Sequence, residues 1–340
     1  MPELLGIECG ATHTVALYEA GYKIDRAEFG PANLRLLNDT QLNRHLRKIA
    51  EQFPRPDAVA IGMAGARTET DKKRLYRAST SFWPSSALHI THDLETAIAS
   101  DTSNNPIHRV LVLSGTGSCC YGQSPDGTKA KLGGWGHILG DKGSGYEIGL
   151  RALKACVFYL DRDGTWSSLG QRLLRRLQLN SPELIIDWVA QANKAEIAGL
   201  AHEVFAAWAK RDKIAVDILN GSADTLAKDA CACARKLTAK TEPVRFLLAG
   251  GVMLNQPRFA AKVAKNIRTR RPGSRILALK NESATGALVL ARRLAKLSSA
   301  KPKTNTQNSQ TLSSNFLLET PKRVLPKDSH YFLLDPINPF

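Results

Sequence analysis

The sequence lacks the signatures of exported, membrane-spanning and zinc-binding proteins. Its first residues contain no basic segment followed by an apolar one, and no later run approaches about 18 uninterrupted apolar residues. The six cysteines form no CxxC pair, and no HExxH or paired Cys/His set offers zinc ligands. We therefore expect a soluble, cytoplasmic protein without a membrane partner, whose thiols are reduced and buried.

Acidic residues are fewer than basic ones, 31 against 47, which gives a net charge of +16. A nucleic-acid partner or an anionic substrate can require such a balance. However, the basic residues recur on amphipathic segments such as 262–271, without interleaved aromatics that could stack on bases. Solvated helix faces explain this pattern better, so we expect no dedicated nucleic-acid surface.

The chain alternates between strand-like and helix-like segments. Residues 4–9 and 14–18 are apolar or alternating runs around a small polar turn, which predicts a β-hairpin. Residues 41–53 have helical spacing, and 58–65 read as a buried strand. This order predicts an α/β lobe with a mixed sheet.

A second strand, small turn and strand begin near Arg109, about a hundred residues after the first such unit. This repetition predicts two related lobes that share a cleft. We expect an N-terminal lobe at 1–108, completed by a helix at about 283–297, and a C-terminal lobe at 109–282. Residues 298–340 are polar with little periodicity, which predicts a disordered tail.

Glycine and threonine follow several predicted strands. In the two hairpin turns, small residues let backbone N–H groups approach phosphate oxygens, although neither turn is a Walker A loop. A third turn, Gly-Gly before a helix, sets bare backbone against a nucleotide. Glu8 can hold a hydrated magnesium ion. The candidate nucleotide-binding residues are Gly10, Thr12, Thr14, Gly115, Thr116, Gly117, Gly250 and Gly251.

Residues 132–146 hold six glycines with Trp135 and Asp141. Such density predicts positive φ or close approach to a ligand, and the aromatic ring and carboxylate suit a polar small molecule. The alternative is a glycine-rich turn whose tryptophan fills the core. Asp93 follows a predicted strand at the edge where ligands of α/β sheets bind, and its local context fits a catalytic carboxylate and a helix N-cap equally.

The order and spacing of 113–118, 133–137, 140–141 and 143–144 resemble the N-acetylglucosamine kinases of the BadF/BadG/BcrA/BcrD ATPase group, within the actin, Hsp70 and hexokinase superfamily. The resemblance runs from about Leu4 to Leu294. It implies an α/β, two-lobed actin/hexokinase-like (ribonuclease H-like) fold, with mixed sheets flanked by helices and a cleft between the lobes. The implied activity is ATP-dependent phosphorylation of an amino sugar, most directly N-acetylglucosamine at its 6-hydroxyl.

The resemblance also implies roles for individual residues. Thr12 and Thr116 would contact the ATP phosphates, Gly250 and Gly251 would lie beside the adenosine, and Asp93 would accept the proton of the sugar hydroxyl. The implied sugar-binding residues are Asn33, Ser118, Gly134, Trp135, Gly136 and Asp141. The implied cofactors are ATP and Mg²⁺ and the implied partner is a small-molecule sugar, while homodimerisation stays open.

Departures from the family pattern leave the substrate open. Ala11 replaces a glycine of the first phosphate turn, Cys119 replaces a polar residue, and Lys142 stands where the family usually has glutamate. Lys142 can pair with Asp141 or favour an acidic sugar, and we expect it to face solvent. The alternatives are a kinase of glucosamine or N-acetylmuramic acid, an iron–sulfur ATPase that activates dehydratases, and a non-catalytic, sugar-responsive ATP-binding regulator.

Overall fold

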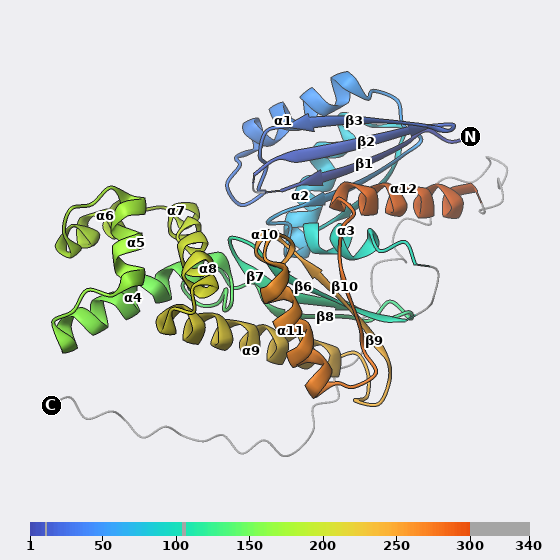
Figure 1. Ribbon diagram of the computed structural model, residues 1–340. Helices are drawn as coiled ribbons and strands as arrows, with labels where there is room; N and C mark the ends of the chain where they lie inside the picture. Colours follow the sequence, from blue (N-terminus) through green and yellow to red (C-terminus); the bar gives the residue numbers. More distant parts are fainter. Residues whose placement is uncertain (11, 104–106, 300–340) are drawn as a thin grey trace, which may run out of the picture. The chain divides into compact units, whose positions relative to one another are not determined.

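The computed structural model describes residues 1–10, 12–103 and 107–299, which belong to one compact unit (Figure 1). The departure at Ala11 and residues 300–340 of the predicted tail lie outside the described residues. Residues 298 and 299 are not tail, because the last helix continues to Ser299. Within the described ranges, no helix is long and apolar enough to cross a membrane.

The first sheet has the order β3-β2-β1-β4-β5. β1 runs antiparallel to β2 and parallel to β4, and β4 is parallel to β5. Helices α1 and α2 supply buried residues to the core on one face of this sheet. The bounds are β1 Leu4–Cys9, β2 Thr14–Ala20, β3 Lys23–Phe29, α1 Asp39–Gln52, β4 Ala58–Met63, α2 Glu69–Thr80 and β5 Ala87–Thr91.

The second sheet repeats the topology of the first, with the order β10-β9-β6-β7-β8. β6 is antiparallel to β7 and parallel to β9, as β1 is to β2 and β4. The sequence repeat therefore corresponds to a repeated sheet, although the sequence pattern did not reveal β8. The bounds are β6 His108–Ser114, β7 Ser118–Gln123, β8 Lys129–Gly133, β9 Val244–Ala249 and β10 Arg275–Ala278.

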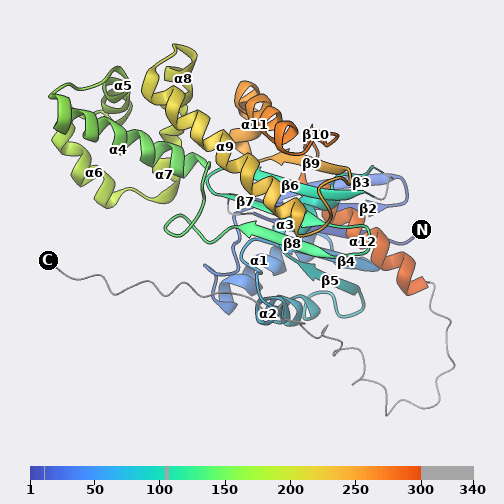
Figure 2. The same ribbon diagram turned by 90° about the horizontal axis from the view of Figure 1, so that it is seen from below.

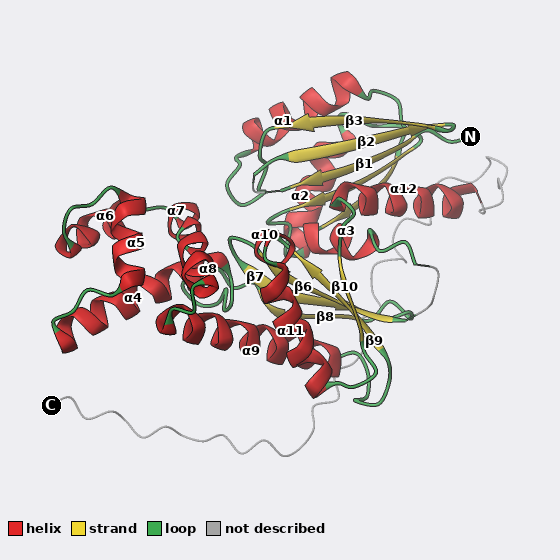
Figure 3. Cartoon of the chain, in the orientation of Figure 1, coloured by secondary structure: helices red, strands yellow, loops and turns green. Residues whose placement is uncertain are grey.

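Between β8 and β9 the chain consists of helices and loops (Figure 3). Helix α9 crosses the second sheet (Figure 2) and packs against β6, β7 and β8. Neither a break at 199–201 nor the short helix α10 was predicted. The bounds are α4 Gly145–Asp163, α5 Ser168–Leu177, η1 Pro182–Leu184, α6 Ile185–Gln191, α7 Lys194–Gly199, α8 Ala201–Ala209, α9 Lys213–Arg235, α10 Gly251–Asn255 and α11 Pro257–Arg270.

Helix α3 (Asp93–Ala99) packs between the two sheets, next to α12 (Ser283–Ser299). Successive β6 side chains point to opposite faces, so Leu111 meets α3 while Val110 and Val112 meet the core that contains α9. Every residue of α3 after Asp93 is buried. The polar end of this helix is thus held in place by apolar packing on both sides.

Glycine allows α12 to approach α3. A Cβ atom on Gly286 would overlap the carbonyl oxygen of Thr96, whereas a Cβ on Gly30 would meet nothing within 4 Å. Because the overlapped atom belongs to a helix backbone, it cannot move away cheaply.

We therefore expect Gly286→Ala to lower the free energy of unfolding by about 1–3 kcal/mol, the usual cost of overpacking. Gly30→Ala is the control and should change it by less than about 0.5 kcal/mol. Chemical denaturation of both variants measures the difference. Equal stabilities would show that α3 and α12 are not packed as described.

Candidate functional site

The carboxyl ends of β1, β4 and β5 meet at one edge of the first sheet, because these three strands are parallel. This edge carries Glu8 near the end of β1, Arg67 after β4 and Asp93 after β5. Burial and the nearby carboxylates of Asp93 and Glu282 raise the pKa of Glu8 to about 7. Two carboxyl groups that act on each other therefore lie at this edge.

Asp93 is the first residue of α3, and the N-cap is His92. The Nδ1 atom of His92 accepts a hydrogen bond of 3.2 Å from the backbone N–H of Glu95. Burial lowers the pKa of His92 to about 4, so the ring is neutral and can accept at physiological pH. The N-cap interpretation of Asp93 is thus excluded, and its carboxylate does not accept the capping hydrogen bond of α3.

Burial raises the pKa of Asp93, and the positive charges of Lys131 and Arg67 oppose this effect. Desolvation disfavours the charged carboxylate, which makes it a stronger proton acceptor once ionised. A half-buried carboxylate with a raised pKa can accept a proton, so Asp93 remains the candidate general base.

The turn between β6 and β7 is fixed by hydrogen bonds to the glycine-rich segment. Ser114 Oγ donates to the Gly143 carbonyl at 2.8 Å, and the Gly145 N–H donates to the Gly115 carbonyl at 2.8 Å. Gly250 has φ of +89°, and a Cβ there would overlap Ser114. Glycine at this position therefore lets the β9–α10 turn lie directly against the β6–β7 turn.

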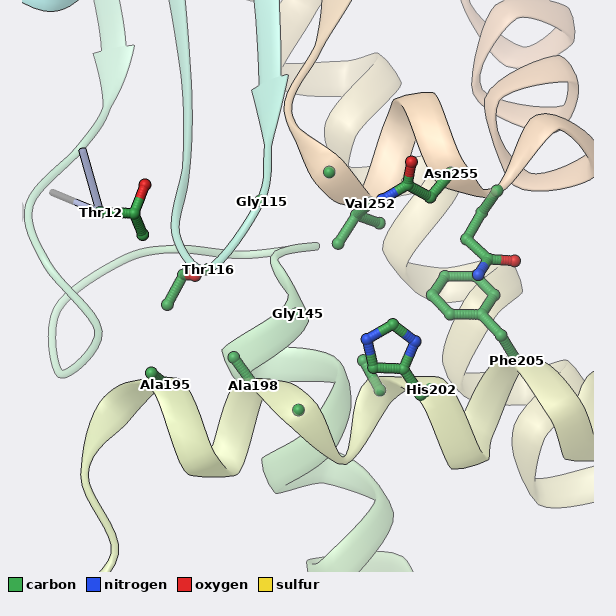
Figure 4. Close-up of a pocket in the computed structure, with 14 residues that line it drawn as sticks. Thr12, Gly115, Thr116, Gly145, Ala195, Ala198, His202, Phe205, Val252 and Asn255 are labelled. Atoms are coloured by element: carbon green, nitrogen blue, oxygen red, sulfur yellow. The ribbon is translucent and has the colours of Figure 1, made fainter. Parts of the chain in front are cut away.

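A cavity of ≈ 450 Å³ opens beside these turns (Figure 4). It is here called the nucleotide cavity, after the nucleotide-binding residues predicted from the sequence that line it. Thr12, Thr116 and Ala195 lie at one end of the view, and His202, Phe205 and Asn255 at the other. Its lining contains no Lys, Arg, Asp or Glu. The lining residues are Thr12, Gly115, Thr116, Gly145, Ala195, Ala198, Gly199, Ala201, His202, Phe205, Gly251, Val252, Asn255 and Gln256.

A second cavity, of ≈ 590 Å³, is here called the sugar cavity, after the sugar-binding residues predicted from the sequence that line it. It brings together parts of both lobes and three of the predicted sugar-binding residues. Trp135 is 73% exposed, so it does not fill the core and its ring is available to a ligand. The lining residues are Asn33, Arg35, Gly65, Arg67, Thr68, Lys131, Gly133, Gly134 and Trp135.

The glycine-rich segment has the backbone conformation that its composition predicts. Positive φ occurs at four of its six glycines, and also at Asp141, with φ of 59°. The four glycines are Gly133, Gly134, Gly136 and Gly143. This part of the prediction is confirmed, because only glycine adopts these angles without strain.

Asp141 does not line the sugar cavity. Its carboxylate is 5% exposed, accepts a 3.0 Å bond from the Ser118 N–H, and pairs with Lys194 at 2.7 Å. Lys142 is exposed and is not the partner of Asp141. Ser118 Oγ is also occupied, since it donates to the Lys142 carbonyl at 2.7 Å. The predicted contacts of Asp141 and Ser118 with sugar would require these bonds to be exchanged.

Other candidates also lie outside the cavity linings. Thr14 is fully buried and its hydroxyl pairs with His45 at 3.0 Å, so it is an internal group and we omit it from the proposed site. Gly10 donates to the His13 carbonyl at 2.9 Å and shapes the turn that presents Thr12. Gly117, Gly136 and Gly250 support their neighbours instead of lining a cavity.

Sequence reasoning missed several lining residues. Arg67 follows the end of β4, so the strand-end rule that selected Asp93 could have found it. Arg35 and Lys131 are brought to the cavity by a turn and by the unpredicted strand β8, and no local motif marks them. His202 and Phe205 lie on a helix whose periodicity predicted only core packing, and Asn255 ends the unpredicted helix α10.

The donor set fits a hydrated Mg²⁺. Among the described residues, no three His, Cys, Asp or Glu side chains are grouped to hold a metal ion. Mg²⁺ does not need such a group, because it keeps several waters and usually takes one or two carboxylates plus substrate phosphates. The Glu8 carboxylate beside Asp93 is an oxygen donor in a region of negative charge that a cation would stabilise.

Glu8→Gln should change how stability depends on pH. Because folding raises the pKa of Glu8 from 4.5 to about 7, the folded protein binds this proton more tightly than the unfolded chain. Wild-type stability should therefore fall by about 3 kcal/mol as pH rises from roughly 4.5 to 7, and the variant should lack this loss. Melting temperatures at pH 5 and pH 8, with and without millimolar Mg²⁺, measure it.

Added Mg²⁺ should raise the melting temperature of the wild type at pH 8 more than that of Glu8→Gln. If both proteins show the same pH dependence and the same Mg²⁺ response, Glu8 has neither the raised pKa nor the metal.

Comparison with known proteins identifies the family that the sequence resembles. The BadF/BadG/BcrA/BcrD ATPase family model matches residues 5–291. An N-acetylmuramic acid/N-acetylglucosamine kinase from Clostridium acetobutylicum is 32% identical over 86% of this chain and 99% of its own length. An N-acetyl-D-glucosamine kinase from Dictyostelium discoideum is 27% identical over 84% of this chain and 97% of its own.

Solved structures are similar in fold. A Chromobacterium violaceum protein assigned as an N-acetylglucosamine kinase superposes with a TM-score of 0.64 at 23% identity, covering 86% of this chain and 99% of its own. A ROK family glucokinase from Streptomyces griseus, crystallised with glucose and AMPPNP, gives 0.52 at 14% identity, with coverages of 86% and 99%. The predicted two-lobed, actin/hexokinase-like α/β fold is confirmed.

Proposed function

Because this chain belongs to the BadF/BadG/BcrA/BcrD ATPase family, we propose that it is an ATP-dependent amino-sugar kinase that converts N-acetylglucosamine to its 6-phosphate. The observation that carries the proposal is Asp93, a half-buried carboxylate just after β5 with a raised pKa. The positive charges of Arg67 and Lys131 lower the pKa of Asp93, and both of these residues line the sugar cavity. The proposed compartment is the cytoplasm, where ATP is available.

The nucleotide cavity suits ATP at both of its ends. Phe205 and Val252 offer apolar contact to the base, and Asn255 offers an amide that can both donate and accept. Thr12 and Thr116 place hydroxyls at the opposite end, beside exposed backbone that phosphate oxygens can approach (Figure 4).

The sugar cavity suits an N-acetyl sugar. The exposed ring of Trp135 offers an apolar face to the pyranose or its acetyl group, and the Asn33 amide can bond to hydroxyls. Gly65 lets Asn33 lie close to the end of β4, because a Cβ there would overlap Asn33 Oδ1. Backbone packing therefore holds Asn33 at the cavity wall, which supports its proposed contact with the sugar.

In the proposed reaction the sugar 6-oxygen forms a bond to the γ-phosphorus as the bond from that phosphorus to the bridging oxygen of ADP breaks. Asp93 takes the proton of the hydroxyl as this bond forms. Glu8 and the phosphates would hold a hydrated Mg²⁺, which would supply charge neutralisation. The remaining work is positioning, which the two glycine-rich turns and Trp135 perform.

Asp93→Asn should reduce turnover by a factor on the order of a hundred or more with little change in ATP affinity, because it removes proton acceptance and no phosphate contact. The measurement is ADP release by wild type and variant, with and without N-acetylglucosamine. Sugar-dependent release by the wild type is the expected result. Near wild-type turnover in the variant would refute the base, and sugar-independent release would refute the kinase.

A second candidate substrate is favoured by the charge of the sugar cavity. Its lining contains three basic residues and no acidic one. Arg35 pairs with Asp71 at 2.9 Å, but Arg67 and Lys131 have no side-chain ion pair among the described residues. Both cations act on the nearby Asp93 carboxylate, but neither is held in an ion pair within the described ranges, and such cations favour an amino sugar that bears a carboxylate, such as N-acetylmuramic acid. The Clostridium relative is named for both sugars.

The double variant Arg67→Gln/Lys131→Gln should lower kcat/KM for N-acetylmuramic acid by about ten- to a hundredfold relative to N-acetylglucosamine, since each lost charge-assisted bond costs about tenfold. Lys142→Gln, which changes an exposed lysine outside the cavity, is the control and should leave the ratio unchanged. Equal losses for the two sugars would rule out carboxylate recognition by this pair.

An iron–sulfur ATPase is not supported as an alternative. Cys119 and Cys120 follow the second phosphate turn but lie buried on β7. All six cysteines are free and buried, as the sequence predicts.

A further inference from the structure

The ion pair between Asp141 and Lys194 is exposed to solvent on one side only. Asp141 is 5% exposed, whereas the Lys194 side chain is 34% exposed, and their atoms Oδ2 and Nζ are 2.7 Å apart. The other carboxylate oxygen, Oδ1, accepts from the Ser118 N–H at 3.0 Å. The carboxylate is thus fixed to the β6–β7 turn, and the lysine is the partner that can move.

The pair lies against the turn that leads into the nucleotide cavity. A Cβ on Gly117 would lie 3.0 Å from both Asp141 oxygens and from Lys194 Nζ. Gly117 directly follows Thr116, and Lys194 directly precedes Ala195, and both Thr116 and Ala195 line the cavity. In Figure 4 these two residues lie at the end away from His202 and Phe205, where the phosphates of a bound nucleotide would lie.

The negative charge of the ATP phosphates requires a cation at the Thr116 end of the nucleotide cavity. ATP carries about four negative charges, of which one Mg²⁺ neutralises two, and phosphoryl transfer needs donors around the γ-phosphate. No Lys or Arg lines the nucleotide cavity, and the cations of the sugar cavity lie beside the other substrate. Lys194 holds an ammonium group on the phosphate turn itself.

We propose that Lys194 is a catalytic residue that binds the γ-phosphate of ATP, and that it leaves Asp141 to do so. The released Asp141 carboxylate then accepts a hydrogen bond from a sugar hydroxyl. The γ-phosphate takes Lys194 away from Asp141, which leaves the Asp141 carboxylate available to the sugar. Bound nucleotide therefore favours binding of the sugar. This inference rests on the proposed function, both for the sugar step and for the placement of the ATP phosphates beside Thr12 and Thr116.

The test measures affinity for AMPPNP, an ATP analogue with a non-hydrolysable γ-phosphate, and for AMP, by isothermal titration calorimetry in Mg²⁺ without sugar. Lys194→Gln should weaken AMPPNP binding about tenfold or more and leave AMP binding within about twofold. Lys194→Arg should retain most of the AMPPNP affinity, because it keeps the charge. Lys142→Gln is the matched control, a neighbouring exposed lysine, and should match the wild type.

Asp141→Asn distinguishes the proposed exchange from an ion pair that only stabilises the fold. It frees Lys194, so AMPPNP affinity should stay equal or increase, while KM for the sugar should rise at least tenfold. If Lys194→Gln weakens the binding of AMPPNP and AMP equally, or changes the binding of neither nucleotide, the inference is wrong. If the wild type phosphorylates no sugar but Lys194→Gln loses AMPPNP affinity selectively, the proposed function fails and the phosphate contact of Lys194 stands.

Discussion

The site depends on backbone contacts that only glycine permits. A Cβ on Gly6 would overlap α12 at Leu288, a Cβ on Gly62 would overlap the Thr96 side chain, and a Cβ on Gly286 would overlap the Thr96 carbonyl. These contacts hold α3 and α12 against the first sheet, while the second sheet packs on the other side of α3. Asp93 starts α3, so its position is set by both lobes at once.

Charge is divided between the two lobes in a way that suits phosphoryl transfer. The edge of the first sheet gathers Glu8 and Asp93, whose mutual repulsion contributes to the raised pKa of Glu8. Lys194 reaches the phosphate turn of the second lobe. A magnesium ion would neutralise the first group, and a triphosphate would attract the second. In the free protein Asp141 already balances the charge of Lys194, so a triphosphate would have to replace this carboxylate.

Local sequence signals predicted most of the strands and the small-residue turns between them, because hydrophobic period and turn composition are local properties. They also predicted positive φ in the glycine-rich segment. The resemblance grouped Asn33 with Trp135, and both line one cavity. The local signals missed what depends on distant packing. Lys194 meets Asp141 across 53 positions, and β8 brings Lys131 to the sugar cavity from a segment without a strong pattern. The resemblance supplied the role of Asp93, for which local context left two interpretations.

The central claim is that the chain transfers phosphate to an amino sugar. Phosphorus NMR of the products formed from ATP, Mg²⁺ and N-acetylglucosamine tests it most directly, because coupling of the phosphorus to the protons on carbon 6 identifies the acceptor oxygen. The account predicts N-acetylglucosamine 6-phosphate and ADP in equal amounts. ADP with inorganic phosphate and unchanged sugar would contradict it.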